Sequence, residues 1–144
     1  MKDILIDANF IHKFENPVSP EIKKFITWLM NHGNLVICDK LIMEYNKCCG
    51  SSSSPTSIIA LLSILGRESR INNVSKSKIK EFKIKKDLEN KLRSEKKDRP
   101  ILISVMLSER KMGLTLDSEL KFDINNYPSY NARAYSDLDE DFYL

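Results

Sequence analysis

Apolar residues are arranged along this chain in short continuous runs that alternate with longer segments of helical spacing. The runs at residues 4–6, 35–38 and 114–116 are continuous, as in strands buried on both faces of a parallel sheet. A weaker run at residues 71–74 predicts a short edge strand. Strands that alternate with helical segments in this way are typical of an α/β domain.

Helical spacing and boundary residues predict the segments between these strands. An amphipathic segment opens at Pro20 and ends at a glycine before the second strand, and Asp39 is expected to cap the helix after that strand. Ser54 and Pro55 are a natural cap and first residue for the next helix. Residues 76–97 are rich in lysine and keep only an incomplete apolar stripe, which predicts one basic helix or two.

The other segments are organised around the stretch at residues 98–122. Asp98 is expected to cap a helix that begins at Arg99, because its carboxylate can accept hydrogen bonds from the first free backbone amides. That helix is apolar nearly all round, so it should be buried, and Gly113 is expected to end it in the left-handed conformation. The apolar run that follows delivers Asp117 to the carboxyl end of a strand, which is where ligands bind in open α/β sheets.

Charge is distributed unevenly along a chain of 144 residues, which is long enough for one domain with a sizeable core. The net charge is only +3, but basic residues gather at 76–97 and acidic residues at 137–141. Lysine and arginine supply most sequence-independent affinity for nucleic acid, so the basic segment is either a solvated face or a phosphate-binding surface. The candidate nucleic-acid-binding residues are Lys83, Lys86, Lys96, Lys97 and Arg99.

Targeting signals and cysteine chemistry give little indication of function. No stretch approaches the ~20 apolar residues of a membrane span, and an acid interrupts the apolar run at the N-terminus, unlike in a signal peptide. We therefore expect a cytoplasmic protein with no membrane association. Cys38, Cys48 and Cys49 form no zinc-binding pattern with His12 or His32, which predicts buried or incidental thiols in a reducing compartment.

Four acids fall at ends of predicted elements that a parallel sheet would bring to one edge: Asp7, Glu44, Asp98 and Asp117. Each acid alone could equally cap a helix or begin a turn, so the prediction of a site depends on their convergence. Mg²⁺ and Mn²⁺ prefer oxygen ligands, and a few carboxylates suffice to hold one or two such ions against a phosphodiester. A cation held there activates water, so no side-chain nucleophile is required, and no Ser/His or Cys/His triad is evident.

The ordered set of motifs resembles the PIN domain, a family of metal-dependent nucleases. The matching segments are an apolar-Asp-Ala-Asn-Phe run that ends at Phe10, an Asp-Lys-Leu-Ile-Met-Glu run that ends at Glu44, the helix opened by Asp98, and an apolar-Thr-x-Asp run that ends at Asp117. The resemblance extends over residues 4–124 and preserves the order of the motifs in the family.

This resemblance implies a fold, an activity and a set of roles. The fold is expected to be a three-layer α/β/α sandwich around a central parallel sheet of four or five strands, with residues 1–130 as the nuclease domain and residues 131–144 as an acidic tail. The activity is expected to be cleavage of single-stranded RNA with Mg²⁺ or Mn²⁺, as in toxins or host-defence effectors that a protein partner binds. The sequence leaves open whether the chain forms a homodimer. The expected catalytic and metal-binding residues are Asp7, Glu44, Asp98 and Asp117, supported by Asn9 and Thr115.

Three other functions stay open from the sequence. The chain could be a PIN-like subunit that has lost catalysis and binds RNA or a protein, or a nuclease that acts on DNA or on a particular nucleic-acid structure. A haloacid-dehalogenase-like phosphatase also carries an Asp at the end of its first strand, but it requires a second Asp where this chain has Asn9. The presence of all four acids favours an active nuclease.

Overall fold

A parallel sheet of five strands forms the centre of the protein. The computed structural model describes residues 2–15, 19–49, 58–138 and 140–143, and the strands are β1 (Lys2–Ile6), β2 (Gly33–Ile37), β3 (Ile71–Asn73), β4 (Met112–Leu114) and β5 (Arg133–Tyr135). Their spatial order is β3-β2-β1-β4-β5, and every neighbouring pair is parallel. The predicted parallel sheet is confirmed, and β3 is the short edge strand that the sequence indicated.

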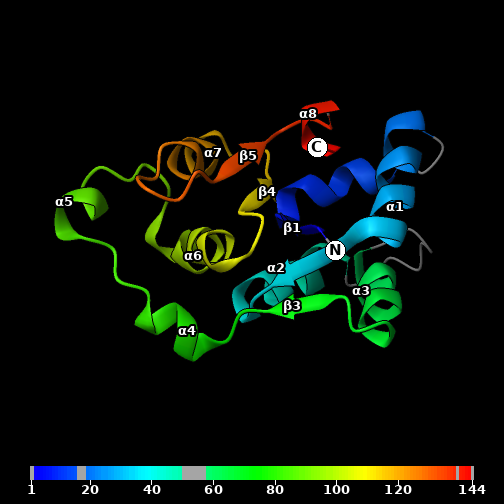
Figure 1. The fold of residues 1–144 in the computed structure, drawn as a ribbon, viewed down its shortest axis with the longest axis horizontal. Helices are drawn as coiled ribbons and strands as arrows, with labels where there is room; N and C mark the ends of the chain where they lie inside the picture. Colours follow the sequence, from blue (N-terminus) through cyan, green and yellow to red (C-terminus); the bar gives the residue numbers. More distant parts are fainter. Residues whose placement is uncertain (1, 16–18, 50–57, 139, 144) are drawn as a thin grey trace.

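Helices connect these strands and cover both faces of the sheet (Figure 1). The helical elements are η1 (Ala8–Glu15), α1 (Pro20–His32), α2 (Asp39–Cys49), α3 (Ile58–Arg67), α4 (Lys76–Glu81), α5 (Lys86–Glu89), η2 (Lys96–Asp98), α6 (Arg99–Leu107), α7 (Ser118–Asn125) and α8 (Glu140–Tyr143).

The strand order decides which face each helix covers. The chain moves across the sheet in one direction from β1 to β3 and in the other from β4 to β5, so right-handed crossovers place α1 and α3 on one face and α6 and α7 on the other. In Figure 1, α6 and α7 lie to the left of the strands, and α1 and α3 lie to the right. The architecture is therefore a three-layer α/β/α sandwich, as expected.

The central strand and the helix that covers it are buried over most of their length. Ile4, Leu5 and Ile6 of β1 are at most 1% exposed, which explains why that strand is a continuous apolar run instead of an alternating one. The apolar helix α6 packs on β1 and β2 and against α7, and it is buried from residue 101 to residue 106.

The end of α6 differs from the prediction. The helix stops at Leu107, and the left-handed residue of the following turn is Lys111, with a φ of 56°. The Ser108 hydroxyl accepts a hydrogen bond from the Lys111 amide at 3.1 Å, so the turn closes without a glycine. Gly113 lies instead inside β4, where an added Cβ would lie 3.5 Å from Val105, so the prediction that Gly113 ends the helix was wrong.

The fourth strand also begins and ends earlier than the apolar run at residues 114–116 indicated. Because β4 already ends at Leu114, Thr115 and Leu116 belong to the loop beyond its carboxyl end. The Thr115 amide still donates to the Tyr135 carbonyl at 3.0 Å, which holds this loop beside the end of β5. The shift moves the Thr115 side chain from the interior of the sheet to its edge.

Arg70 ends helix α1 in a way that the sequence did not reveal. Its buried guanidinium donates to the carbonyls of Leu29, Met30 and Gly33, the last at 2.6 Å. Carbonyls at a helix C-terminus have no partner within the helix, so these bonds satisfy them. Gly33 is needed there for space, since an added Cβ would lie 2.6 Å from the side chain of Leu29.

The basic segment forms two short helices, α4 and α5, which is one of the two arrangements that the sequence allowed. Ser75 caps the first of them, since its hydroxyl accepts from the Lys78 amide at 3.3 Å. The helix before this segment, α3, is described from Ile58 onward. Its predicted start at Ser54 and Pro55 lies outside the described residues.

Two remaining sequence predictions concern the cysteines and membrane association. Cys38 is a buried free thiol and Cys48 is an exposed one. Within the described ranges, no helix is both long enough and apolar enough to cross a membrane.

The C-terminal residues, expected to be an acidic tail after residue 130, are part of the fold. Strand β5 completes the sheet beside β4, and Phe142 of α8 is fully buried. The Phe142 ring lies 5.6 Å from that of Phe25 and 5.3 Å from that of Trp28, centroid to centroid. The boundary at residue 130 was therefore misplaced, because the sequence pattern gave weight to the acids of this segment and not to its aromatic residues.

We predict that Phe142→Ala lowers the free energy of unfolding by about 3–5 kcal/mol, the usual cost of truncating a buried phenylalanine. Urea denaturation followed by circular dichroism measures it. Asp137→Ala is the matched control in the same segment. The described contact of Asp137 is an exposed ion pair with Lys13 at 3.2 Å, so its loss should lower the free energy of unfolding by less than about 1 kcal/mol. If both substitutions lowered the free energy of unfolding by the same small amount, the C-terminal segment would not contribute to the core.

Candidate functional site

Asp7 lies at the carboxyl end of β1 and is almost completely buried, with 5% of its surface exposed. Its Oδ1 accepts a hydrogen bond from the Ala8 amide at 2.8 Å, and its Oδ2 accepts one from the Thr115 hydroxyl at 2.7 Å. The Asp7 amide donates to the Leu114 carbonyl at 2.8 Å. These bonds fix the carboxylate between the ends of the two central strands.

Thr115 connects two of the candidate acids. Its hydroxyl donates to Asp7 and accepts from the Asp117 amide at 3.1 Å. Asn9 joins the same network, since its side-chain oxygen accepts from the Leu116 amide at 2.9 Å and its side-chain nitrogen lies 3.4 Å from the Thr115 hydroxyl. Asn9 and Thr115, the two residues expected to support the site, therefore connect the segments that follow β1 and β4.

Asp117 is the N-cap of α7. Its Oδ1 accepts from the amides of Glu119 at 2.9 Å and Leu120 at 3.2 Å. The capping role that the sequence left open is therefore present. It does not require the negative charge, because an asparagine oxygen caps a helix about as well as a carboxylate.

Glu44 enters the site from α2. This helix begins directly after β2, and its Tyr45 hydroxyl donates to the Ile6 carbonyl, which anchors the helix at the end of β1 next to Asp7. The Glu44 carboxylate is half-buried and pairs with Lys40, one turn earlier, at 3.4 Å.

Asp98 precedes α6, but its side chain makes no capping bond to that helix. Its φ of −93° and ψ of 1° continue the turn of η2 instead of the extended backbone typical of an N-cap, so the predicted cap was wrong although the helix does begin at Arg99. The Cys38 sulfur lies 4.0 Å from the Pro100 carbonyl oxygen, which places the start of α6 beside the end of β2. Asp98 therefore lies at the same edge of the sheet as Asp7.

The acids influence one another electrostatically. Burial raises the pKa of Asp7 from 3.8 to about 6, against the opposing effect of its bonds to Thr115 and Ala8, and the charges of Glu44 and Asp98 raise this pKa further. The pKa of Asp98 is also raised, first by burial and then by the charges of Glu44 and Asp117. All four acids are thus within electrostatic reach of at least one other, and their repulsion makes the ionised cluster unfavourable.

The four acids do not converge on one point in this conformation. Of the residues that the structure describes, no three His, Cys, Asp or Glu side chains lie close enough together to hold a metal ion. Carboxylate oxygens are nevertheless the ligands that Mg²⁺ and Mn²⁺ prefer, and a cation would relieve the repulsion within the cluster. The donor chemistry therefore fits such an ion, provided that side chains at the edge, such as Glu44 and Asp98, change rotamer.

Four of the five candidate nucleic-acid-binding residues have exposed side chains, namely Lys83, Lys86, Lys96 and Lys97. Lys97 pairs with Glu95 at 3.3 Å and lies close enough to Asp98 to lower the pKa of that acid. The end of the basic segment therefore lies beside the acidic site.

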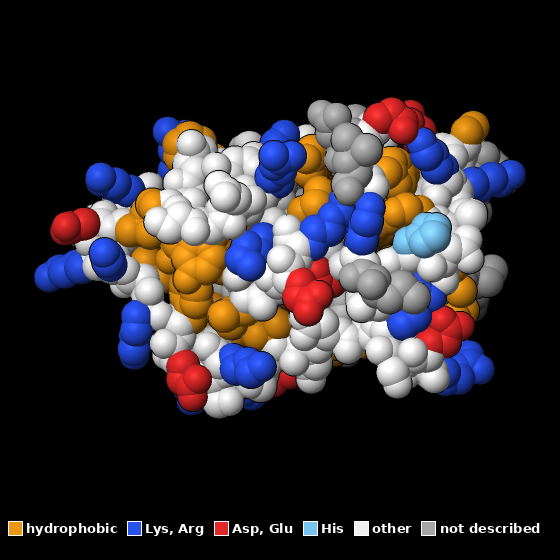
Figure 2. Space-filling view, in the orientation of Figure 1, with side chains coloured by type: hydrophobic (Ala, Val, Ile, Leu, Met, Phe, Trp, Pro, Cys, Tyr) orange, Lys and Arg blue, Asp and Glu red, His pale blue; other side chains and the backbone are white. Residues whose placement is uncertain are grey.

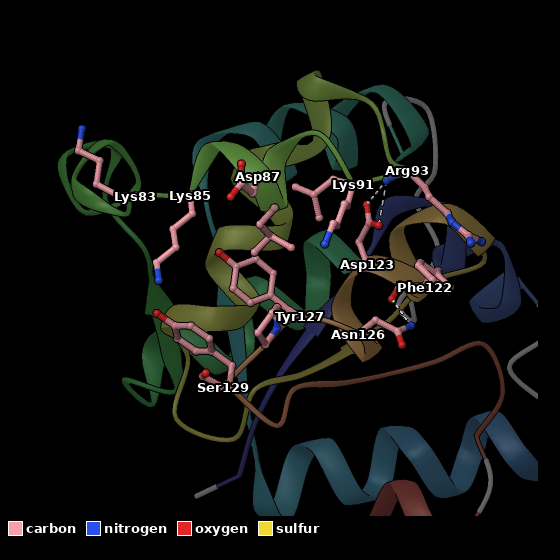
Figure 3. Close-up of a pocket in the computed structure, with 14 residues that line it drawn as sticks. Lys83, Lys85, Asp87, Lys91, Arg93, Phe122, Asp123, Asn126, Tyr127 and Ser129 are labelled. Atoms are coloured by element: carbon pink, nitrogen blue, oxygen red, sulfur yellow. Dashed lines mark hydrogen bonds between the residues drawn. The ribbon is translucent and has the colours of Figure 1, made fainter.

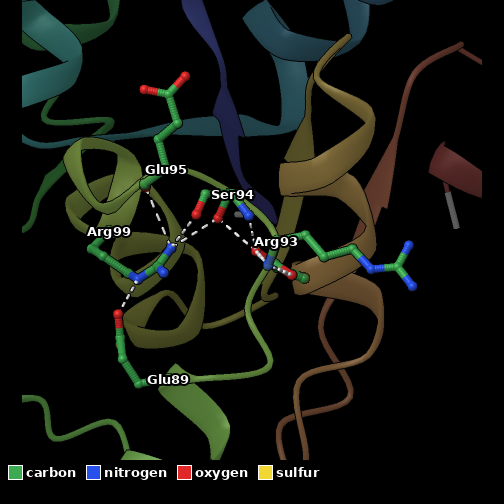
Figure 4. A network of polar contacts seen from close by, with 6 residues as sticks. Glu89, Arg93, Ser94, Glu95 and Arg99 are labelled. Carbon is green, nitrogen blue, oxygen red and sulfur yellow. Dashed lines mark hydrogen bonds and ion pairs between the residues drawn. The ribbon is translucent and has the colours of Figure 1, made fainter.

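Arg99, the fifth candidate, has a different role. Figure 4 shows its guanidinium turned toward Glu89 and Ser94, with Nε donating to Glu89 at 3.0 Å and Nη1 to the Ser94 hydroxyl at 3.0 Å. Its side chain is only 13% exposed. Arg99 thus links α5 to the start of α6, and its guanidinium is engaged within the protein, so its role as a nucleic-acid contact stays a prediction.

A cavity of about 800 Å³ is the feature that sequence reasoning missed. It is lined by residues of α5, by the second half of α7 and by the loop after α7 (Figure 3). Two of its aromatic residues, Tyr127 and Tyr130, lie beyond the last predicted strand, where the sequence indicated only a turn. The density of tyrosine beside a basic segment was the available signal.

Comparisons with protein-family models, with curated proteins and with solved structures give no match for this chain.

We predict that Asp7→Asn stabilises the metal-free protein at pH 7. The raised pKa of Asp7 corresponds to a cost of roughly 3 kcal/mol when the group is ionised, and asparagine does not carry that cost. In the wild type, the contribution of Asp7 to stability should be present below pH 3.8 and lost as the pH rises to about 6. Urea unfolding at a series of pH values should show this loss in the wild type and a smaller one in Asp7→Asn. A less stable variant with an unchanged pH profile would contradict the raised pKa.

The two roles of Asp117 can be separated by two substitutions. Asp117→Ala removes the cap and should lower the free energy of unfolding by about 0.5–2 kcal/mol, whereas Asp117→Asn keeps a capping oxygen and should change it little. Chemical denaturation without metal measures both. A loss in Asp117→Asn as large as that in Asp117→Ala would mean that the charge itself, through the positive end of α7, holds the helix.

Proposed function

We propose that this protein is a metal-dependent endoribonuclease that cleaves single-stranded RNA at the carboxyl edge of its sheet. The observation that carries the proposal is the placement of four acids, from four separate segments, each within electrostatic reach of at least one other. Like charges brought together at the edge of a sheet destabilise the fold, so they indicate a function that uses them. The residues concerned are Asp7, Glu44, Asp98 and Asp117.

These acids would hold Mg²⁺ or Mn²⁺ through their carboxylate oxygens. A cation bound there would lower the pKa of a coordinated water and offset the negative charge that develops on a phosphodiester as it is cleaved. Asp7, with a pKa of about 6, is mostly ionised at pH 7 and is therefore available as a ligand.

The role of the surrounding polar residues is to position the acids. The Thr115 hydroxyl orients Oδ2 of Asp7, and the same hydroxyl accepts the amide of Asp117. Asn9 ties the loop after β4 to the loop after β1 through the Leu116 amide. Two acids from distant parts of the sequence are thereby held in a fixed relation, which lowers the cost of reaching a reactive geometry.

We propose RNA as the substrate because of the basic residues near the acids and because of the resemblance to PIN domains. Lys96 and Lys97 directly precede Asp98, so cations that attract phosphate lie beside the acids. The motifs that resemble the PIN family support single-stranded RNA as the substrate and a cytoplasmic toxin or host-defence effector, held by a protein partner, as the biological setting.

A second candidate is a PIN-like subunit that binds RNA or a protein without cleaving. It is favoured by the lack of convergence among the described acids and by the ion pair that engages Glu44 with Lys40. Cleavage assays separate the two candidates, because this subunit would bind RNA equally with and without a divalent cation and release no product.

Purified protein should cleave a labelled single-stranded RNA with Mn²⁺ or Mg²⁺ and not with EDTA. Mn²⁺ should also raise the melting temperature, because it binds only the folded state. Asp7→Asn should abolish the Mn²⁺-induced shift and lower the cleavage rate at least about 100-fold, and Thr115→Val should lower the rate about 10–100-fold through misplacement of Asp7.

Glu21→Gln is the matched control, because Glu21 is an exposed acid on α1, on the opposite face of the sheet from α6. It should leave cleavage and the metal-induced shift unchanged. Cleavage in EDTA, or an Asp7→Asn variant as active as the wild type, would overturn the proposal. Metal-dependent cleavage of DNA but not RNA would keep the acidic site and change the substrate.

A further inference from the structure

The cavity of about 800 Å³ lies apart from the acids, beside the second half of α7. Its volume is within the range of roughly 300–1,000 Å³ that is usual for pockets that bind small molecules, so it has room for groups the size of a nucleotide. In Figure 2, hydrophobic side chains are exposed toward the end of the molecule that carries α4 and α5, with Lys and Arg side chains around them.

The rings of Tyr127 and Tyr130 form one wall of this cavity. Phe82 does not line the cavity but packs against both of them, with the three ring centroids 5.3–6.2 Å apart. Tyr127 is buried, whereas Tyr130 is partly exposed, so Tyr130 is held in place by its neighbours and keeps open ring surface at the cavity. Leu88 and Leu92 add apolar surface. Flat apolar surfaces of this kind are suited to stacking by a nucleobase.

Basic side chains supply the charge of the cavity. Lys83, Lys85, Lys91 and Arg93 line it, against only two acids. One of those acids, Asp123, is buried and already accepts hydrogen bonds from the Arg93 amide at 2.9 Å and from the Ser94 amide at 2.8 Å. Its charge is thus stabilised within the protein, and the lysines remain available to an anion.

We propose that this cavity binds one or two nucleotides of single-stranded RNA, with a base on the open face of Tyr130 and flanking phosphates at Lys85 and Lys91. Among the residues that the structure describes, none forms an ion pair with the cavity lysines. Apolar ring surface together with these positive charges matches the two components of single-stranded nucleic acid, a base and a phosphate. In Figure 3 the Lys91 side chain points into the space between Tyr127 and Asp123.

A duplex does not fit this arrangement, because its bases are already stacked and cannot enter a cavity. An acidic protein segment would use the lysines but has no need of a ring face. The cavity is also rigidly connected to the acids: the Ser94 hydroxyl donates to Asp123 at 2.5 Å and accepts from Arg99 at 3.0 Å, and Asp98 is the next residue before Arg99 (Figure 4). On the proposed function, on which this part of the inference rests, the cavity holds substrate RNA that flanks the cleaved bond.

Binding is tested without cleavage, by fluorescence anisotropy of a labelled oligouridine in EDTA. The double variant Lys85→Gln/Lys91→Gln should weaken binding and reduce the slope of log K against log salt by about 1.4, as expected for two lost phosphate contacts on a single strand. Tyr130→Ala should weaken binding about tenfold, and Tyr130→Phe, which keeps the ring, should bind as the wild type does.

The control Lys23→Gln/Arg67→Gln removes the same charge from α1 and α3, on the opposite face, and should bind RNA like the wild type. Unchanged affinity and salt slope in the Lys85/Lys91 variant would overturn the inference, as would an equal loss in the control. Tighter, ring-independent binding of a poly-glutamate peptide would assign the cavity to an acidic protein instead.

The experiment also separates this inference from the proposed function. If the protein cleaves nothing yet its RNA binding depends on Tyr130, Lys85 and Lys91, the cavity is an RNA site and the nuclease proposal fails. If Asp7→Asn loses cleavage while the Lys85/Lys91 variant binds RNA like the wild type, the nuclease proposal stands and the cavity assignment fails.

Discussion

Burial of one carboxylate at the end of the central strand is the constraint on which the rest of the structure depends. Asp7 loses most of its hydration, which raises its pKa to about 6, and only the Ala8 amide and the Thr115 hydroxyl offset that loss. For the Thr115 hydroxyl to reach Asp7, β4 must lie beside β1 in the observed register and end at Leu114. The position of the last acid, Asp117, follows from the same bond because its amide donates to Thr115.

Two other buried acids show what a purely structural carboxylate looks like in this fold. Asp3 accepts from the amides of Glu109 at 3.0 Å and Arg110 at 2.8 Å, and Asp123 accepts from two amides and a hydroxyl. Both hold a loop by backbone hydrogen bonds, as caps do. Asp7 differs because further acids stand nearby and raise its pKa. This contrast supports a cation as the partner of the edge acids, since a cation would favour the ionised forms that burial and repulsion disfavour.

The sequence predicted the strands, the parallel sheet and the buried helix because their signals are local: continuous apolar runs and boundary residues. It also drew attention to Asp7 and Asp117, since both follow strands. It did not reveal the structural roles of Gly113, Arg99 and the C-terminal segment, because those roles depend on partners elsewhere in the chain. The turn before β4 is closed by Ser108, Arg99 reaches back to Glu89, and Phe142 meets Trp28 across more than 100 residues. No periodicity encodes such contacts, and the cavity beside Tyr130 was missed for the same reason.

The central claim, that the edge acids form a divalent cation site, depends on the ionisation of Asp7. Its carboxyl pKa can be measured directly by a carbon-13 NMR titration, with and without Mg²⁺. The account predicts a pKa of about 6 without metal, and a clear decrease with Mg²⁺, because a bound cation favours the ionised form. A pKa near the ordinary value of 3.8, or a raised pKa that Mg²⁺ leaves unchanged, would contradict it.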